Sequence, residues 1–358
     1  MGKLYLKLVF LLFPLFYVSY LLYGALTIPH EDIRILRQSS SLALAIPERK
    51  PEQAVIPPLL VAPSPPPPVA VLDEPPKSQI LPTPRALAPS MRRIPPFTAK
   101  SVPITYAEER HIRAAIVVDA DSRTILYAKN HRQELPIASI TKAFLMDEVY
   151  DQMKRGSFRM DTVVTTSRRA SLTGGSKMYL RENDPVMISD LIKGALIHSA
   201  NDAAHQLGEH IGSGDIRRAL SLLNNKAHSL GLEKTRLYNV TGLPDGNRDN
   251  ISTAYEVAQM AYKILVEHGE MVGVANTQLD YYIRPTGDEF MMVNRNRPLV
   301  RVDYIDGLKT GFTNRAGWCL VATSHKNGRR LITVILNATD RNTRDRAARK
   351  LIDHYSRS

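Results

Sequence analysis

Apolar and polar positions divide the 358-residue chain into three stretches. From Leu8 to Ile28 the run LVFLLFPLFYVSYLLYGALTI carries no charge, and about 20 apolar residues are what a helix needs to cross a bilayer. From Pro47 to about Pro103 proline is frequent enough to favour extended conformations over a packed core. The alternation of a globular domain begins at about Tyr106 and continues to the end of the chain.

Strand patterns stand at the two ends of this globular stretch. The sequence HIRAAIVVDADSRTILYAKN predicts two strands joined by a polar turn at residues 119–122. The sequence GWCLVATSHKNGRRLITVILNA predicts a second hairpin, whose Asn327-Gly328 pair suits a two-residue turn. Before it, Pro285 to Arg301 has no regular pattern and is expected to form an irregular loop.

Helical periodicity fills the region between the hairpins. It runs from Ser139 to about Arg155 and recurs in ISDLIKGALIH, NDAAHQLGEHIG and STAYEVAQMAYKILVEHG, where Thr253 and Glu256 are spaced as a capping box. A last helix is predicted from about Thr343 to Tyr355. Strands, a helical insert, further strands and a terminal helix predict an α+β fold, in which helices cover an antiparallel sheet.

We therefore predict three regions: a transmembrane signal anchor at 1–30, a disordered proline-rich linker at 31–105, and a globular domain at 106–358. Lys3 and Lys7 precede the apolar run, so the positive-inside rule favours a cytoplasmic N-terminus and an exported remainder. A cleaved signal peptide is the alternative. It is disfavoured because Tyr23 occupies a position where a small residue is expected before the cut at Ala25.

The net charge of +12 and the pI near 9.7 do not indicate a nucleic-acid partner, because Lys and Arg are scattered and form no block of five. Attraction to anionic polymers of a cell envelope accounts for the charge equally well. The single cysteine, Cys319, allows no internal disulfide and no cysteine metal cluster. Its apolar surroundings predict a buried core residue.

Three short motifs occur in order: Ser139-Ile-Thr-Lys142, Ser199-Ala-Asn201 and Lys309-Thr310-Gly311. Each is common alone, and the combination carries the argument. The serine and the lysine of the first motif are three residues apart at the start of a predicted helix, so they share one face. Free backbone amides at this helix end can stabilise a developing negative charge. The second motif falls between two helices, and the third is expected to open a strand after Asp306-Gly307.

With PIASITKAFLM, YNVTGLPDGN and GLKTGFTNRAGWCLVATS, these motifs resemble the serine-type D-Ala-D-Ala carboxypeptidase family of low-molecular-mass penicillin-binding proteins. The resemblance covers nearly all of the chain from about Tyr106. It implies the β-lactamase and DD-peptidase-like transpeptidase fold. It also implies peptidoglycan stem peptides as substrates, β-lactam antibiotics as covalent inhibitors, and a catalytic domain on the periplasmic side of the bacterial inner membrane.

The resemblance also implies residue roles. Ser139 is the nucleophile, Lys142 its general base, and Ser199 a proton relay to the leaving amine, while Asn201 holds the substrate backbone and orients Lys142. The substrate carboxylate is expected at Lys309 and Thr310, beside Gly311, and the backbone amides of Ser139 and Phe312 are expected to form the oxyanion hole. Whether Arg341 or another cation assists stays open.

Three other functions compete with the carboxypeptidase. A D,D-endopeptidase would use the same nucleophile and cleft to cut peptidoglycan crosslinks. A β-lactamase needs a carboxylate that activates water, and Glu233 is the candidate, although its surroundings lack that family's pattern. A silent wall-binding scaffold would be free to lose the motif residues that this chain keeps.

No cofactor and no metal are predicted. His198, His205 and His210 lack the spacing of a zinc-binding helix, and no carboxylate pattern near them completes a site. They are expected to be ordinary core or surface residues.

Overall fold

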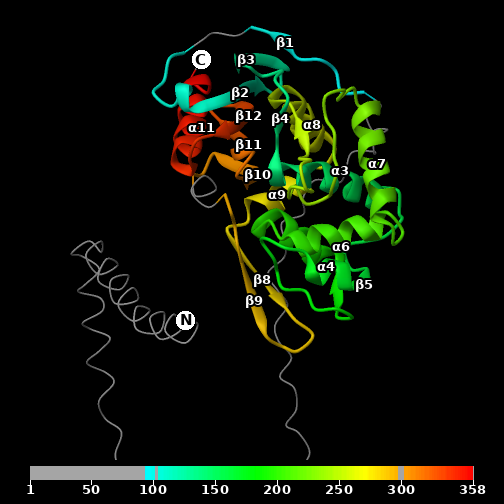
Figure 1. Cartoon of the computed structure of the whole chain (residues 1–358). Helices are drawn as coiled ribbons and strands as arrows, with labels where there is room; N and C mark the ends of the chain where they lie inside the picture. Colours follow the sequence, from blue (N-terminus) through cyan, green and yellow to red (C-terminus); the bar gives the residue numbers. More distant parts are fainter. Residues whose placement is uncertain (1–92, 101–103, 297–301, 358) are drawn as a thin grey trace, which may run out of the picture. The chain divides into compact units, whose positions relative to one another are not determined.

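The computed structural model describes residues 93–100, 104–296 and 302–357 (Figure 1). Its central sheet has the strand order β1-β3-β2-β12-β11-β10. The α+β fold is confirmed, and both predicted hairpins are present. The main strands are β2 (Ile112–Asp119), β3 (Thr124–Lys129), β10 (Ile305–Thr313), β11 (Gly317–Lys326) and β12 (Arg329–Ala338).

The sheet is buried on both faces because helices cover each side. In β11, Cys319 and Val321 belong to the larger core with the helical insert, whereas Leu320 and Ala322 belong to a second core beneath the terminal helix. This alternation is the period of two expected of a strand. The terminal helix is α11 (Arg341–Tyr355). The tight turn of the second hairpin is confirmed by the positive φ of Asn327, 51°, and of Gly328, 76°.

The folded region extends upstream of the boundary predicted at residue 105. β1 (Thr98–Ala99) pairs in parallel with β3. Ile94 and Phe97 are buried, and the Phe97 ring packs edge-on against Tyr255 at 5.5 Å between centroids. The proline-rich composition concealed this short strand, since two apolar residues among prolines carry no detectable period. The folded domain therefore begins no later than about residue 93.

The predicted helices are present, with the capping threonine in place. The helix α8 (Ala254–Glu267) begins after Thr253, whose hydroxyl accepts from the amide of Glu256 at 3.0 Å. The Glu256 carboxylate instead accepts from the amide of Lys234 at 2.9 Å. The helices not predicted are α4 (Arg168–Leu172), α7 (Ile216–Ser229) and α9 (Gly269–Asn276).

Short two-stranded ladders interrupt the helical insert. The prediction of an irregular loop at 285–301 is wrong for residues 289–293. These form the strand β9 (Glu289–Val293), which pairs with β8 (Leu279–Ile283). Its sequence EFMMV is an apolar run whose only pairing partner is another short strand, so local pattern alone did not reveal it. The other ladders are β4 (Leu135–Pro136) with β7 (Ile251–Ser252), and β5 (Val163–Thr165) with β6 (Pro185–Met187).

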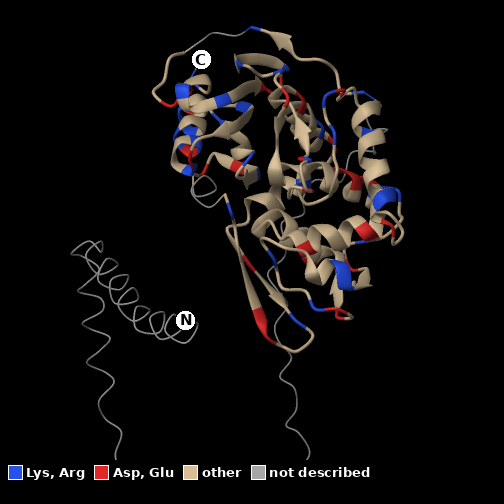
Figure 2. Ribbon diagram, viewed as in Figure 1, with Lys and Arg blue, Asp and Glu red and all other residues tan. Residues whose placement is uncertain are grey.

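The predicted anchor at 1–30 lies outside the described residues, as does most of the predicted linker. Within the described ranges, none of the helices combines the length and the apolar character needed to cross a bilayer. Lys and Arg are distributed over several elements of the domain, including α11, which agrees with the scattered charge of the sequence (Figure 2).

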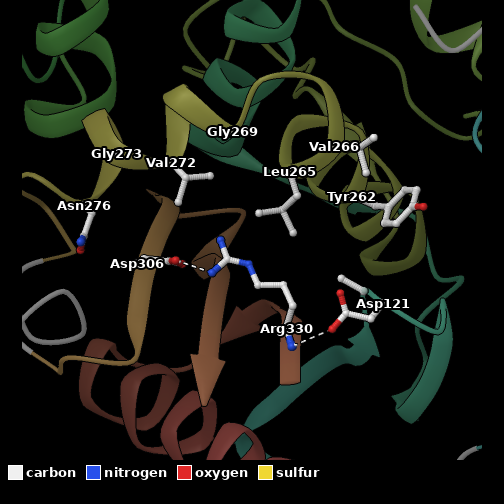
Figure 3. A pocket seen from close by; sticks show the side chains of 11 residues that line it. Asp121, Tyr262, Leu265, Val266, Gly269, Val272, Gly273, Asn276, Asp306 and Arg330 are labelled. Carbon is white, nitrogen blue, oxygen red and sulfur yellow. Dashed lines mark hydrogen bonds and ion pairs between the residues drawn. The ribbon is translucent and has the colours of Figure 1, made fainter. Parts of the chain in front are cut away.

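A cavity of about 620 Å³ opens where α8 and α9 meet the starts of β10 and β12 (Figure 3). The Arg330 side chain crosses it and pairs with Asp306, and the Arg330 amide donates to Asp121 at 3.3 Å. Both carboxylates that line this cavity thus accept from Arg330, Asp306 from its guanidinium and Asp121 from its backbone amide. None of its lining residues belongs to the three motifs.

Candidate active site

Ser139 and Lys142 lie one turn apart at the start of a buried helix. Ser139 is in the short 3₁₀ turn η3 (Ala138–Ile140), which leads directly into α3 (Thr141–Lys154). The helix is buried along most of its length, so it fixes the position of both residues in the core. Lys142 Nζ is 2.9 Å from Ser139 Oγ, and the lysine side chain is fully buried.

Two further oxygens surround the Lys142 amine. Nζ is 2.7 Å from Asn201 Oδ1 and 2.7 Å from the carbonyl oxygen of Thr241. Asn201 is itself held by the carbonyl of Gly174, which accepts from Nδ2 at 2.8 Å. The amine is therefore confined to one place, within hydrogen-bond distance of the serine hydroxyl.

Ser199 and Asn201 occupy the junction between two helical segments, as the sequence predicts. The π-helix η4 (Gly194–His198) ends at Ser199, whose φ of 61° reverses the chain before α6 (Asn201–Ile211) begins. The reversal lets both side chains reach the same cleft. Ser199 Oγ accepts from Lys309 Nζ at 2.9 Å.

The Lys309-Thr310-Gly311 motif lies within β10, three residues beyond Asp306, and does not open the strand as expected. β10 is an edge strand paired with β11 on one side. Its other side faces η3, and a Cβ added at Gly311 would lie 2.9 Å from the carbonyl oxygen of Ile137. Glycine is therefore required for the strand to approach the segment that carries Ser139 this closely.

Burial controls the charge of both lysines. Desolvation, and next the neighbouring cation of Lys309, hold the pKa of Lys142 well below its usual value, although the Asp202 carboxylate opposes the shift. Desolvation, followed by the charges of Arg295 and Arg344, lowers the pKa of Lys309 to about 7. Burial thus disfavours the protonated form of both amines, and Lys309 titrates near neutral pH.

The motifs surround a cavity of about 530 Å³. Thr310 is buried at its wall, and Phe312 is 47% exposed and stacks on Trp318 at 4.3 Å between ring centroids. No carboxylate lines this cavity among the residues that the structure describes, whereas three arginines do, so it attracts anions. Its lining includes Ser139, Ser199, Asn201, Thr310, Gly311, Phe312, Arg295, Arg341 and Arg344.

Arg295 is a site residue that the sequence did not single out. Its guanidinium donates to Ser176 Oγ at 2.9 Å and to the carbonyl oxygen of His198 at 3.2 Å, and it is 3.1 Å from His198 Nε2. The histidine is half-buried, and desolvation, followed by the Arg295 charge, lowers its pKa to about 4. His198 is therefore neutral at pH 7 and supports the loop that carries Ser199.

Thr241 and Arg344 were also missed. Thr241 contributes a backbone carbonyl, which no residue type signals, although it stands in the quoted YNVTGLPDGN segment. Arg344 is fully buried beside Trp318 and donates to Asp345 Oδ1 at 2.6 and 2.8 Å. Arg341, which the sequence left open, also lines the cavity.

One group in the described residues has the composition of a metal site. Asp147, Asp151 and His268 place ligand atoms within 4.8 Å of one another. Lys226 Nζ is 2.7 Å from Asp147 Oδ2, and Lys263 Nζ is 2.7 Å from Asp147 Oδ1. The carboxylates are thus neutralised by two ammonium groups, so these residues fit a buried ion-pair network and do not fit a cation.

The fold and the site together place a serine hydroxyl beside a buried amine, the arrangement that serine acyl-transfer enzymes use. Residues 100–340 match the family model described as D-alanyl-D-alanine carboxypeptidase. The chain is 33% identical over 241 residues to the D-alanyl-D-alanine carboxypeptidase DacF of Bacillus subtilis, covering 67% of this chain and 61% of that protein. It belongs to the D-alanyl-D-alanine carboxypeptidase family.

Other relatives agree. DacD of Escherichia coli is 31% identical over 267 residues, which cover 72% of this chain and 66% of DacD. Among solved structures, DacD of Francisella tularensis superimposes with a TM-score of 0.65 at 28% identity, covering 71% and 72% of the two chains. Penicillin-binding protein D2 of Listeria monocytogenes, solved in a cefotaxime-bound form, gives 0.63 at 26%, covering 70% and 98%. The chain thus spans less than two thirds of either curated relative.

Proposed function

We propose that the protein is a D-alanyl-D-alanine carboxypeptidase that removes the terminal D-alanine of peptidoglycan stem peptides through an acyl-enzyme at Ser139. The observation that carries the proposal is the buried Lys142 amine, 2.9 Å from Ser139 Oγ. Family membership and the cefotaxime-bound relative support the substrate class and the reaction with β-lactams.

The contacts of Lys142 suit its neutral form. A neutral amine has two hydrogens and one lone pair. The hydrogens can point to Asn201 Oδ1 and to the Thr241 carbonyl, both at 2.7 Å. The lone pair is then left for the Ser139 hydroxyl, whose proton moves to Nζ as Oγ attacks the carbonyl carbon. The backbone amides of Ser139 and Phe312 are proposed to hold the oxyanion.

Lys309 and Ser199 are proposed to serve the leaving group. The proton gained by Lys142 must reach the amine of the departing D-alanine, and Ser199 Oγ, held by Lys309 at 2.9 Å, is placed as a relay. Lys309 and the nearby arginines are proposed to supply the charge that binds the terminal carboxylate, and Thr310 a hydroxyl that donates to it. Water then attacks the ester carbonyl, which releases the shortened peptide and restores the hydroxyl.

The test is intact-mass analysis of the full chain after incubation with penicillin and, separately, with a synthetic stem pentapeptide. We expect one covalent penicillin adduct and release of D-alanine, both lost in Ser139→Ala. A Ser189→Ala variant is the matched control, because that serine lies outside the cavity. An adduct that persists in Ser139→Ala would overturn the assignment of the nucleophile.

Endopeptidase activity is the second candidate. A D-alanyl-D-alanine endopeptidase of Haemophilus influenzae is 27% identical over 208 residues, covering 58% of this chain and 68% of that protein. Digestion of purified crosslinked muropeptide dimers separates the two activities: an adduct with dimer cleavage, and without D-alanine release from the pentapeptide, favours the endopeptidase. A β-lactamase function is disfavoured, because the side chain of Glu233 does not line the cavity. It is 58% exposed and contacts His228.

We further propose that residues 1–30 anchor the chain in the inner membrane, with the domain on the periplasmic side. The uncharged run from Leu8 to Ile28, preceded by two lysines, supports this orientation. Fusion of a periplasmic reporter enzyme after residue 358 tests it, and a reporter active only in the cytoplasm would contradict it.

A further inference from the structure

An exposed apolar surface lies on the β5–β6 ladder, and none of its residues lines the active-site cavity. Val163 and Met187 face each other across the ladder and are 59% and 42% exposed, whereas the alternating Val164 and Val186 turn inward. Met160 adjoins the pair, since its carbonyl accepts from the Ser189 amide at 3.0 Å. Apolar side chains that adjoin one another on the surface, with polar residues around them, mark candidate interaction sites.

A shallow pocket of about 320 Å³ continues this surface. Met160 belongs to both, and Met153 and Phe158 also line the pocket. Tyr150, another lining residue, is 2% exposed, and its hydroxyl has no hydrogen-bond partner within the described chain. An occupant that brings an apolar chain together with a hydrogen-bond acceptor would satisfy both features.

The segment around β5 is basic, whereas the segment around β6, residues 181–193, carries two cations and three carboxylates. Residues 154–172 contain five Lys and Arg residues and one Asp, so the segment has a net charge of +4. All five cations are exposed, and Figure 2 marks cations on α4. Arg168 and Arg169 form no ion pair within the residues that the structure describes, whereas Arg155 pairs with Glu148 and Arg159 with Asp161. One carboxylate, Glu270, stands at the rim of the pocket.

We propose that the surface formed by Met160, Val163, Met187 and the adjoining pocket, with its surrounding cations, docks on a bilayer that contains anionic phospholipid. Acyl chains match the exposed side chains and the pocket, phosphate groups match Arg168 and Arg169, and an ester carbonyl can accept from the Tyr150 hydroxyl. A second copy of this chain fits less well, because two-fold association would oppose one +4 segment to another.

The buried cysteine makes the proposal testable in the full chain. Cys319 is fully buried, so a cysteine introduced by Val163→Cys can be labelled selectively with an environment-sensitive fluorophore. Ser122→Cys, in the exposed turn after β2, is the control. Each labelled chain is reconstituted into vesicles of phosphatidylglycerol or of phosphatidylcholine, with a bromine quencher on the acyl chains, and folding is checked by circular dichroism.

We expect quenching of the label at position 163, and not of that at 122, in phosphatidylglycerol vesicles. Arg168→Gln and Arg169→Gln should each lower the ratio of docked to undocked protein roughly fivefold. Equal quenching at positions 163 and 122 would overturn the proposal. It would also be overturned if position 163 were shielded from a water-soluble quencher in phosphatidylcholine vesicles without being quenched by the brominated acyl chains, since that result indicates a protein partner.

Discussion

At the residue scale, Arg295 controls the charge of Lys309. It is the first charged neighbour that holds the pKa of Lys309 at about 7, after burial itself. The carboxylate binding proposed for Lys309 requires its protonated form, so the acylation rate is expected to fall as the pH rises through about 7. Arg295→Gln removes a cation and is expected to raise the pKa of Lys309. The decline of the acylation rate with pH, the falling limb of the profile, should then move to higher pH. Penicillin acylation rates measured across pH test this.

Arg341→Gln is the matched control for this shift. Arg341 also lines the cavity, but it is not among the charges that lower the pKa of Lys309. We expect its falling limb to stay at the wild-type pH. A limb that moves equally in both variants would assign the effect to total cavity charge and would contradict the role given to Arg295.

Residue type determined what the sequence could predict of the site. Ser139, Lys142, Ser199 and Asn201 belong to short motifs, and the structure brings them together with Lys309. Thr241 acts through a carbonyl that every residue possesses. Arg295 reaches the cavity from a hairpin distant in sequence, and a lone arginine carries no pattern that distinguishes it from a solvated surface charge.

At the element scale, Gly242 lets the turn that carries the Thr241 carbonyl pass against the nucleophile. Its φ is +85°, and a Cβ there would lie 2.0 Å from the carbonyl oxygen of Ala138. Gly242→Ala must therefore displace either the turn or the segment before Ser139. A shift of about 1 Å can cost about a hundredfold in rate, and we expect penicillin acylation to fall by that order.

Gly246→Ala separates steric contact from backbone strain. Gly246 has a φ of +57° and no atom within 4 Å of an added Cβ, so alanine there incurs the left-handed strain of roughly 1–2 kcal/mol without a clash. We expect its acylation rate to stay near that of the wild type. Similar losses in both variants would indicate that turn strain, rather than contact with Ala138, limits the site.

Most long periodic elements were predictable, although the 14-residue helix α7 was missed, and elements defined by tertiary pairing were not. The β11–β12 hairpin carries its turn type in two residues, and α8 carries its cap in one. β9 lies in a stretch that contains Pro, Gly and several charged residues, and it becomes a strand because β8 pairs with it. The three-residue strands β5 and β6 are too short for any period to emerge.

At the scale of the whole molecule, the strand β1 and the residues before it fasten the start of the domain. Phe97 packs against Tyr255 and Tyr262, with ring centroids 5.5 and 6.0 Å apart. We expect Phe97→Ala to lower the free energy of unfolding by about 3 kcal/mol, measured by urea denaturation. Lys100→Ala, at an exposed position, should change this free energy by less than about 0.5 kcal/mol. Equal effects of the two variants would contradict the proposal that Phe97 stabilises the start of the domain.

The strand order has a consequence for synthesis. β2 pairs with β12, which lies more than 200 residues later in the chain. In the sheet, β11 pairs with β12, and β10 pairs with β11 at the edge. Because synthesis begins at the N-terminus, β2 and β3 are made long before β12, and the backbone groups of β2 that pair with β12 stay unpaired until then. Such non-local pairing is slow. Ser139 and Lys142 lie in the consecutive segments η3 and α3, but the strand β10 that completes their cleft is among the last parts to be made. The time at which a newly made chain begins to react with penicillin is therefore expected to report when folding is complete.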